Sequence, residues 1–230
     1  LLRGDYTNPG EDVFPAVPEL LGGWKSEYPK NRLGLARWLT SADHPQLARV
    51  TVNRYWQMFF GVGLVKTTED FGSQGESPSH PKLLDSLALD LIESGWNLRF
   101  VLKKIVLSAT YRQSSIERAD IHDPGNRLLS RGPRFRLSAE AIRDQALFVA
   151  GLLVDKPGGP SVMVYQPEGL WLDLGDRNGF TRPHVVGDYE DVHRRSMYVY
   201  AKRAMPNPVL STFDTPSRDV CVVKRQNTNT

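Results

Sequence analysis

The sequence predicts a mainly α-helical protein, a bundle of about five helices over residues 33–153 followed by an irregular C-terminal lobe with a few short β-strands. Apolar residues recur at helical spacing through the bundle, and Pro157-Gly158-Gly159-Pro160 interrupts that pattern. Short β-branched and aromatic runs follow the interruption. We therefore expect an extended lead-in over residues 1–30, a helical core over 31–156 and an α+β lobe over 157–230, packed on the core.

The first two helices are marked by apolar spacing and by helix-start residues. Trp38 belongs to a short predicted helix over residues 33–40. The second helix follows Asp43-His44-Pro45, where Asp43 can cap the free amides and proline is tolerated in the first turn. It is apolar almost all round, with Trp56 near its middle, and Gly61 ends it. Such a helix is typical of the centre of a core.

The next two helices predict an antiparallel hairpin. The third helix opens at Ser79-His80-Pro81, which repeats the His-Pro device of the second helix, and it stops at Gly95. Asn97 can cap a fourth helix that runs to Ala109. Because the connection is very short, the two helices are expected to be antiparallel neighbours. The preceding residues 62–79 are rich in Gly, Ser and Thr and predict a loop.

The last predicted helix closes the bundle. Ser138 caps a helix through Leu153, with Ile142 and Val149 on its apolar face. Short strands are expected at residues 162–165 and 196–200.

Composition limits the classes of function and compartment. Twenty-nine basic residues face 26 acidic ones, interleaved along the chain, for a net charge of +3. Since a nucleic-acid binder concentrates its basic residues on one face, no nucleic-acid partner is expected. No apolar run approaches the ~20 residues of a membrane span, so no span is expected in this segment. The lone Cys221 excludes an intramolecular disulfide. Leu1 and the polar end at Thr230 indicate a piece cut from a longer protein.

Charged residues inside and beside the helices predict structural ion pairs. Arg54 lies in the most apolar helix, where it either reaches the surface with its head group or is buried beside a carboxylate such as Glu69 or Asp70. Arg112 permits the same interpretation.

A second charged group surrounds the start of the last helix. Arg134 and Arg136 precede Glu140, Arg143 and Asp144. The spacing of Glu140 and Asp144 places both carboxylates on one side of the helix, and paired carboxylates can serve acid/base chemistry. The neighbouring arginines suit a salt-bridge network better, so a structural role is favoured over a catalytic one.

The long loop from residue 168 to 195 predicts the best ligand site in the sequence. Aromatic and polar side chains that gather in one loop suit a sugar ring or another small polar ligand. The residues concerned are Trp171, Asp173, Asp176, Arg177, Arg182, His184 and Tyr189. His184 and His193 are weak candidates for a metal, because their spacing is not specific, and no metal is predicted. The chain has no CxxCH, GxSxG or GxxxxGK[ST] motif, and neither catalysis nor its absence follows from the residues.

Several motifs spread along the chain resemble those of one domain family. They are NRLGLARWL at 31–39, TVNRYW at 51–56, EDFG at 69–72, LSATYRQSS at 107–115, GPRFRLSAE at 132–140, RRSMY at 194–198, TFD at 212–214 and RQNTNT at 225–230. Together they are similar to an uncharacterised planctomycete-specific family of C-terminal domains. The similarity extends over nearly the whole chain.

The resemblance implies a cellular setting but no catalytic residue. Members of that family lie in large exported proteins, often with an upstream c-type cytochrome domain and sometimes encoded near glycan-degrading enzymes. This implies an extracytoplasmic location, upstream domains of the same polypeptide as partners, and a link to redox chemistry or polysaccharide utilisation. A glycan is a further partner that the resemblance allows. The segment itself is expected to hold no cofactor, and the resemblance allows haem c in an upstream domain.

Three hypotheses remain open from the sequence. The favoured one is an accessory or ligand-binding domain. The alternatives are a carbohydrate-active catalytic domain using the 168–195 loop, and a purely structural scaffold between domains.

Overall fold

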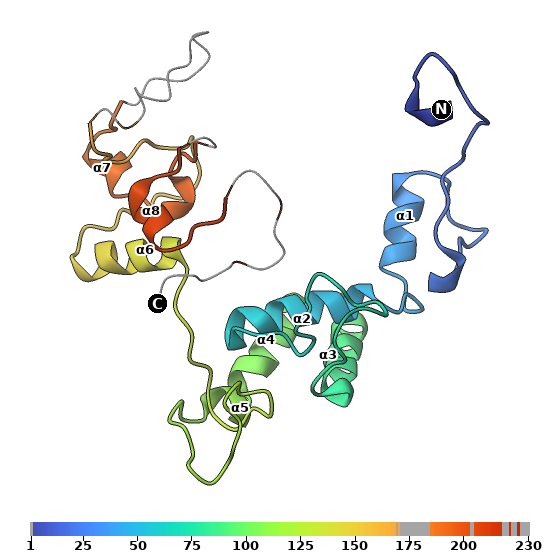
Figure 1. Ribbon diagram of the computed structural model, residues 1–230, viewed down its shortest axis with the longest axis horizontal. Helices are drawn as coiled ribbons and strands as arrows, with labels where there is room; N and C mark the ends of the chain where they lie inside the picture. Colours follow the sequence, from blue (N-terminus) through green and yellow to red (C-terminus); the bar gives the residue numbers. More distant parts are fainter. Residues whose placement is uncertain are drawn as a thin grey trace. The chain divides into compact units, whose positions relative to one another are not determined.

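The protein is mainly helical and is divided into two compact units, Leu1–Arg134 and Phe135–Thr230 (Figure 1). The computed structural model describes residues 2–168, 170, 185–202, 205–217, 221 and 225. Unit 1 contains η1 (Leu2–Gly4), η2 (Glu19–Leu21), α1 (Arg32–Leu39), α2 (Leu47–Phe60), α3 (Pro81–Glu93), α4 (Leu98–Leu107) and α5 (Ala109–Arg112). Unit 2 contains α6 (Ala139–Val149), α7 (Tyr189–Val192), η3 (Ser196–Tyr198) and α8 (Pro208–Thr212).

The core of unit 1 is formed where α2 packs on α3, and α3 on α4 (Figure 1). Val52 and Trp56 of α2 are buried with Leu91 of α3 and Ile105 of α4. The ring of Trp56 stacks on Phe60 with 4.0 Å between ring centroids. These contacts place the helix containing Trp56 in the core, although its buried apolar residues recur every four positions on one face rather than all round it.

The predicted helix ends are largely confirmed. Gly61 ends α2 with a φ of 77°, a backbone conformation that glycine adopts without steric cost. The side chains of Asn97 and Ser138 accept hydrogen bonds from backbone N–H groups at the starts of α4 and α6. The prediction that Asp43 caps α2 is wrong. Asp43 pairs with Lys25 at 2.7 Å, which leaves the first amides of α2 to another side chain.

The loop between α2 and α3 is fixed to the core by two polar side chains. Asn53, which is fully buried, accepts a hydrogen bond from the N–H of Val65 and donates one to its carbonyl, both at 2.9 Å. The guanidinium of Arg127 donates to the carbonyls of Gly63 and Leu64 at 2.8 and 3.0 Å. The loop is therefore held by hydrogen bonds from side chains to its backbone rather than by regular secondary structure.

The predicted strands of the C-terminal lobe are not formed. Among the described residues, the lobe contains isolated parallel bridges that pair Val154 with Arg194 and Val162 with Val199. The expected partners do meet, because the N–H of Val162 donates to the carbonyl of Tyr198 at 2.8 Å. The backbone of residues 196–198 turns into η3 instead of continuing the ladder, so the contact stays a single bridge.

The structure places the boundary between units before α6 rather than after it. The sequence prediction assigned this helix to the core at 31–156, whereas it contacts η3 and α8 within unit 2. The predicted apolar face of α6 is largely uncovered, with Val149 79% exposed. Only Ala139 of this helix is buried. The spacing of apolar residues predicted the α6 helix correctly, but it did not indicate which elements would pack against that helix.

The lead-in over residues 1–30 is mostly irregular and begins unit 1. Val13 and Phe14 of this segment are exposed, whereas Trp24 is partly buried beside Gly34 of α1. Within the described part of the chain, no helix has the length and hydropathy that crossing a membrane would require.

Candidate functional site

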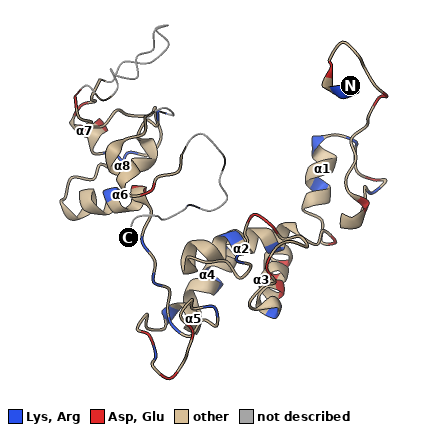
Figure 2. Ribbon diagram, viewed as in Figure 1, with Lys and Arg blue, Asp and Glu red and all other residues tan. Residues whose placement is uncertain are grey.

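A cavity of about 400 Å³ lies in unit 1, where the starts of α2 and α3 meet the loop between these helices. Its volume falls in the range of pockets that bind small molecules. The lining residues are Gln46, Arg49, Val65, Phe71, Gly72, Gly75, Glu76, Ser77, Pro78, Pro81, Leu84 and Asp85. The charged residues of α2 are basic, whereas α3 carries acidic residues and one lysine (Figure 2).

The helical wall of the pocket carries an ion pair between α2 and α3. The Nε of Arg49 donates to Oδ1 of Asp85 at 2.6 Å, and another guanidinium nitrogen donates to the carbonyl of Pro45. Both charged side chains are partly exposed, at 40% and 50%. An ion pair with this exposure contributes little to stability, so its clearest effect is to neutralise the wall of the pocket.

The loop wall of the pocket is held by a compact turn. The hydroxyl of Thr67 donates to the carbonyl of Asp70 and accepts from the N–H of Glu76, both at 2.9 Å. A Cβ at Gly75 would lie 2.2 Å from the carbonyl oxygen of Asp70, so only glycine fits there. The Glu76 carboxylate lies 3.3 Å from the ammonium of Lys66. This second wall is neutralised as well.

The rest of the lining is apolar and includes one aromatic ring. Leu84 and Val65 are buried members of the core, and the partly buried Phe71 packs against that core. The pocket thus combines compensated charges, an amide from Gln46 and a hydroxyl from Ser77 with apolar surface. Such a lining can hydrogen-bond the hydroxyl groups of a ligand and contact its C–H faces without attracting a net charge.

Most of the residues predicted to bind a ligand lie outside the described residues. This applies to Trp171, Asp173, Asp176, Arg177, Arg182 and His184. Tyr189 is described and is exposed, with its ring 4.3 Å from that of His193. His193 donates from Nδ1 to the Tyr189 carbonyl at 2.7 Å, because a carbonyl oxygen can only accept. In the described ranges, no group of three or more metal-ligating side chains comes together.

The arginines predicted as ion pairs separate into exposed and buried ones. Arg54, Arg112 and Arg134 are exposed. Arg54 follows the predicted alternative in which its head group reaches the surface. Asp70, its expected partner, accepts instead from the N–H of Gly72 at 2.7 Å. The buried polar residue of α2 is the adjacent Asn53.

The other predicted charged residues do work together in unit 2. Arg136 pairs with Asp214, and Glu140 pairs with Arg225. Burial is the largest single influence on Glu140 and opposes its ionisation, but the hydrogen bonds that the carboxylate accepts and the charge of Arg225 together outweigh burial and lower the pKa of that carboxyl. Asp144 accepts from the N–H of Ser196 at 2.7 Å. This arrangement agrees with the structural interpretation of the two carboxylates.

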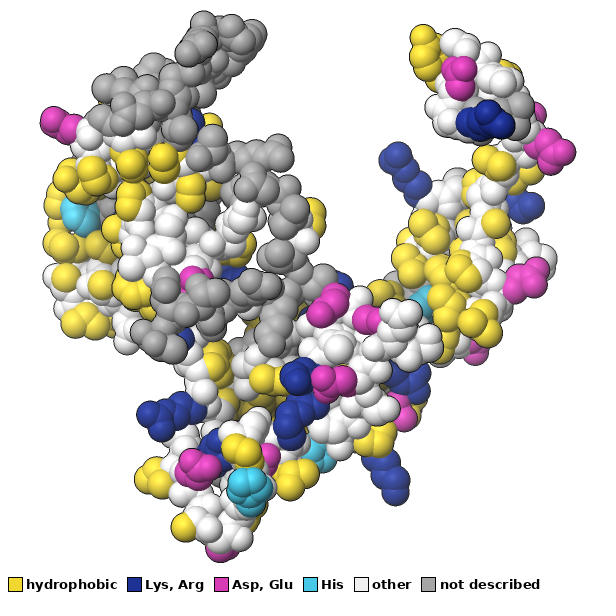
Figure 3. Space-filling view, viewed as in Figure 1, with side chains coloured by type: hydrophobic (Ala, Val, Ile, Leu, Met, Phe, Trp, Pro, Cys, Tyr) yellow, Lys and Arg dark blue, Asp and Glu magenta, His cyan; other side chains and the backbone are white. Residues whose placement is uncertain are grey.

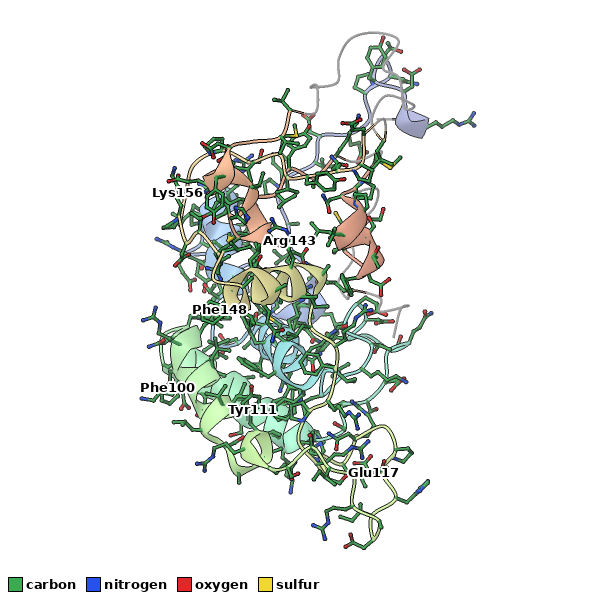
Figure 4. All side chains as sticks on the ribbon, turned by 90° about the vertical axis from the view of Figure 1, so that its left-hand side faces the viewer. Phe100, Tyr111, Glu117, Arg143, Phe148 and Lys156 are labelled. Atoms are coloured by element: carbon green, nitrogen blue, oxygen red, sulfur yellow. The ribbon has the colours of Figure 1, made fainter. Side chains whose placement is uncertain are left out.

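Arg143 of α6 is the centre of that arrangement (Figure 4). It donates to the carbonyls of Val192 and Arg194 at 2.7 and 2.9 Å, and to the hydroxyl of Ser196 at 3.1 Å. Burial lowers the pKa of its guanidinium. With its donors committed to backbone carbonyls, Arg143 holds the chain around η3 rather than facing a ligand.

Sequence reasoning missed the pocket because its residues come from three separate segments with ordinary composition. The signal that was present is Thr67-Thr68-Glu69-Asp70-Phe71-Gly72, whose turn-forming residues precede a second helix start. That pattern indicates a loop, but it does not indicate which helices the loop will pack against.

One comparison with known proteins gives a result. Residues 31–230 match the model of the PSD1 family, which is described as a protein of unknown function (DUF1553). None of the curated proteins and none of the solved structures is similar enough to match.

Proposed function

This chain belongs to the PSD1 family of proteins of unknown function (DUF1553), and from that premise we propose that it is an accessory domain that binds a neutral, polyhydroxylated ligand such as a sugar. The observation that carries the proposal is the cavity of about 400 Å³ whose charged walls are internally paired. A neutral ligand suits these walls because it leaves both ion pairs in place. An anion or a cation would compete with one member of each pair.

The sugar class follows from the mixed surface of the pocket. Carboxylate, guanidinium, amide and hydroxyl groups can each bond a ligand hydroxyl, whereas the partly buried ring of Phe71 offers apolar surface to C–H groups. The resemblance described above supports a role in polysaccharide utilisation, in an exported parent protein with a c-type haem domain upstream. The extracytoplasmic location and the haem are parts of the proposal that rest on that resemblance.

A panel of soluble saccharides tests the proposed ligand class. Isothermal titration is expected to show binding of neutral members and weaker binding of uronic acids, sulfated sugars and amino sugars. Asp85→Asn leaves Arg49 without its carboxylate, so it should weaken neutral binding by roughly tenfold and improve binding of acidic members. Asp90→Asn is the matched control. Asp90 lies on the same helix and pairs with Lys104 away from the pocket, so its loss should leave binding unchanged.

Binding of charged sugars in preference to neutral ones would overturn the ligand class. If Asp85→Asn and Asp90→Asn changed binding equally, the ligand would not bind in this pocket.

A scaffold role has one observation in its favour. Unit 2 exposes many apolar side chains, including Phe148 and Met197, and Figure 3 shows hydrophobic groups over the part that carries α7 and α8. Exposed apolar groups that gather on one face are typical of a surface that another protein covers. Hydrogen exchange separates the two roles. A scaffold predicts that α6 amides are slower to exchange in the full-length parent than in this chain, and equal rates would contradict it.

A further inference from the structure

Two helices of unit 1 begin with the same His-Pro sequence, yet their histidines are used differently. At α2, Nδ1 of His44 accepts hydrogen bonds from the N–H groups of Gln46 at 3.3 Å and Leu47 at 3.1 Å. At α3, His80 contacts the hydroxyl of Ser79 at 3.0 Å, and its side chain does not cap the helix. Only the first histidine replaces the capping residue that a helix start normally has.

The hydrogen bonds of His44 define its protonation state. A nitrogen that accepts from two N–H groups has a free lone pair, so the ring is neutral and its proton is on Nε2. The ring is 8% exposed and meets the edge of Trp38 with 4.6 Å between centroids. Nε2 is buried and has no hydrogen-bond partner in the part of the chain that the structure describes. The surroundings of His44 therefore accept a neutral ring and offer nothing to a second proton.

We propose that His44 is a pH-sensitive cap, whose neutral ring fixes the first turn of α2 and whose protonation releases it. A proton on Nδ1 would face two donors instead of accepting from them. The positive charge of the protonated ring would also be buried at the N-terminus of α2, which is the positive end of the helix dipole. Each effect opposes protonation in the folded state, and burial lowers the pKa of this imidazole.

The charged groups around His44 do not compensate for this. Asp43 is paired with Lys25, and the hydrogen bond between them lowers the pKa of Asp43 and raises that of Lys25. On α1, Arg37 precedes Trp38 and is exposed. On α2, Arg49 is paired with Asp85. The pair of Asp43 and Lys25 stays charged across the range in which a histidine titrates, because the pKa of Asp43 is lowered and that of Lys25 is raised.

The cap is connected to the pocket through the first turn of α2. Gln46 donates to the ring and lines the pocket, and Arg49 lines it one turn later. The other guanidinium contact of Arg49 is to the carbonyl of Pro45, inside the same turn. Release of the cap would therefore disturb one wall of the pocket. The expected change in ligand affinity rests on the proposed function. The release of the cap on protonation does not depend on it.

The direction of the pH dependence follows from the lowered pKa. The cap is intact above the ordinary histidine value of 6.5 and is lost as pH falls through the lower value of the folded protein. Ligand affinity is expected to fall in the same direction.

Nitrogen-15 NMR of the histidine rings in the whole chain is the test. We expect His44 to show the tautomer protonated at Nε2 at pH 7 and to titrate below 6.5. As it titrates, the Gln46 and Leu47 amides should lose roughly fivefold in protection, after correction for intrinsic exchange, which is the size of one lost cap. A proton on Nδ1 at pH 7, or an ordinary titration midpoint, would overturn the proposal even if every variant failed to fold.

Two matched variants sharpen the test. Asparagine can accept from the same two amides at any pH, so His44→Asn should keep them protected at low pH, whereas His80→Asn should leave the wild-type pH dependence unchanged. A fall in protection that survives His44→Asn contradicts the proposal. Titration with soluble neutral oligosaccharides adds the functional part. If the cap titrates but no saccharide binds at any pH, the cap stands and the proposed function fails.

Discussion

Unit 1 and unit 2 are stabilised in different ways. In unit 1, apolar side chains from α2, α3 and α4 bury one another, and polar groups such as Asn53 fix the loop at the edge. In unit 2, arginines take the central positions. Arg194 is 3% exposed, and its guanidinium donates to the carbonyls of Lys156, Gly158 and Pro160. Helical periodicity therefore predicts unit 1 well, whereas unit 2 depends on contacts that have no period.

The largest effect is expected in the core of unit 1. Leu91 is fully buried, so Leu91→Ala should leave a cavity and lower the free energy of unfolding by about 3 kcal/mol. Urea unfolding measures this difference. Leu89→Ala is the control on the same helix, because Leu89 is 55% exposed and its loss should cost less than about 0.5 kcal/mol. Similar values for the two variants would contradict the packing of α3.

In unit 2, Arg194 should matter almost as much. Arg194→Ala removes the hydrogen bonds of a buried guanidinium to the carbonyls of residues 156–160 and the stacking on Tyr198, whose ring centroid lies 4.0 Å from the guanidinium carbon, and should cost about 2–3 kcal/mol. Arg194→Lys should recover little, since an ammonium cannot reach several carbonyls in one plane. Amide exchange of α6 and η3 reports the loss. Arg195→Ala, with a half-exposed side chain, is the control that should change almost nothing.

The edge of the unit 1 core should show a smaller effect. Asn53→Ala leaves the N–H and carbonyl of Val65 without their partner and should cost about 2 kcal/mol. Arg54→Ala at the adjacent, exposed position should cost less than about 0.5 kcal/mol. Thermal unfolding of the pair decides which of the two neighbours is structural, and a larger loss for the Arg54 variant would reverse the assignment.

The smallest effect is expected from pH at the loop that follows α5. Burial, the largest single influence, would raise the pKa of Asp123, but hydrogen bonds from Leu128, Arg127 and Ser130 together outweigh it and lower the pKa below 3.8. The carboxylate therefore stabilises the fold above pH 3.8, and this contribution disappears as pH falls through the lower value of the folded state. Asp123→Asn should flatten the acid limb of an unfolding curve. An unchanged limb would show that Asp123 has no such role.

The difference between the two units also decides which features could be predicted from the sequence. The burial of Trp56 and the caps at Asn97 and Ser138 were predictable because each depends on neighbours within a few residues. The cap of α2 was assigned to Asp43 instead of His44, because a carboxylate is the commoner capping group and the pull of Lys25 is not visible in the sequence. Long-range pairing therefore decided a local feature.

The site was less predictable than the fold. The charged group at Glu140, Arg143 and Asp144 was interpreted as structural, but its partners could not be predicted: those of Arg143 and Asp144 lie about fifty residues away in the sequence, at Val192, Arg194 and Ser196. The pocket needs the start of α2, the start of α3 and the turn at Gly75 to meet. No spacing in a sequence reports such a meeting.

The central claim is that the pocket of unit 1 binds a neutral polyhydroxylated ligand, and methyl NMR tests it most directly. On addition of soluble neutral oligosaccharides, the methyl signals of Val65 and Leu84 should shift in a saturable way, while those of Leu210 in unit 2 stay in place. Saturable shifts confined to unit 2, or unchanged Val65 and Leu84 signals with every neutral oligosaccharide, would contradict the claim.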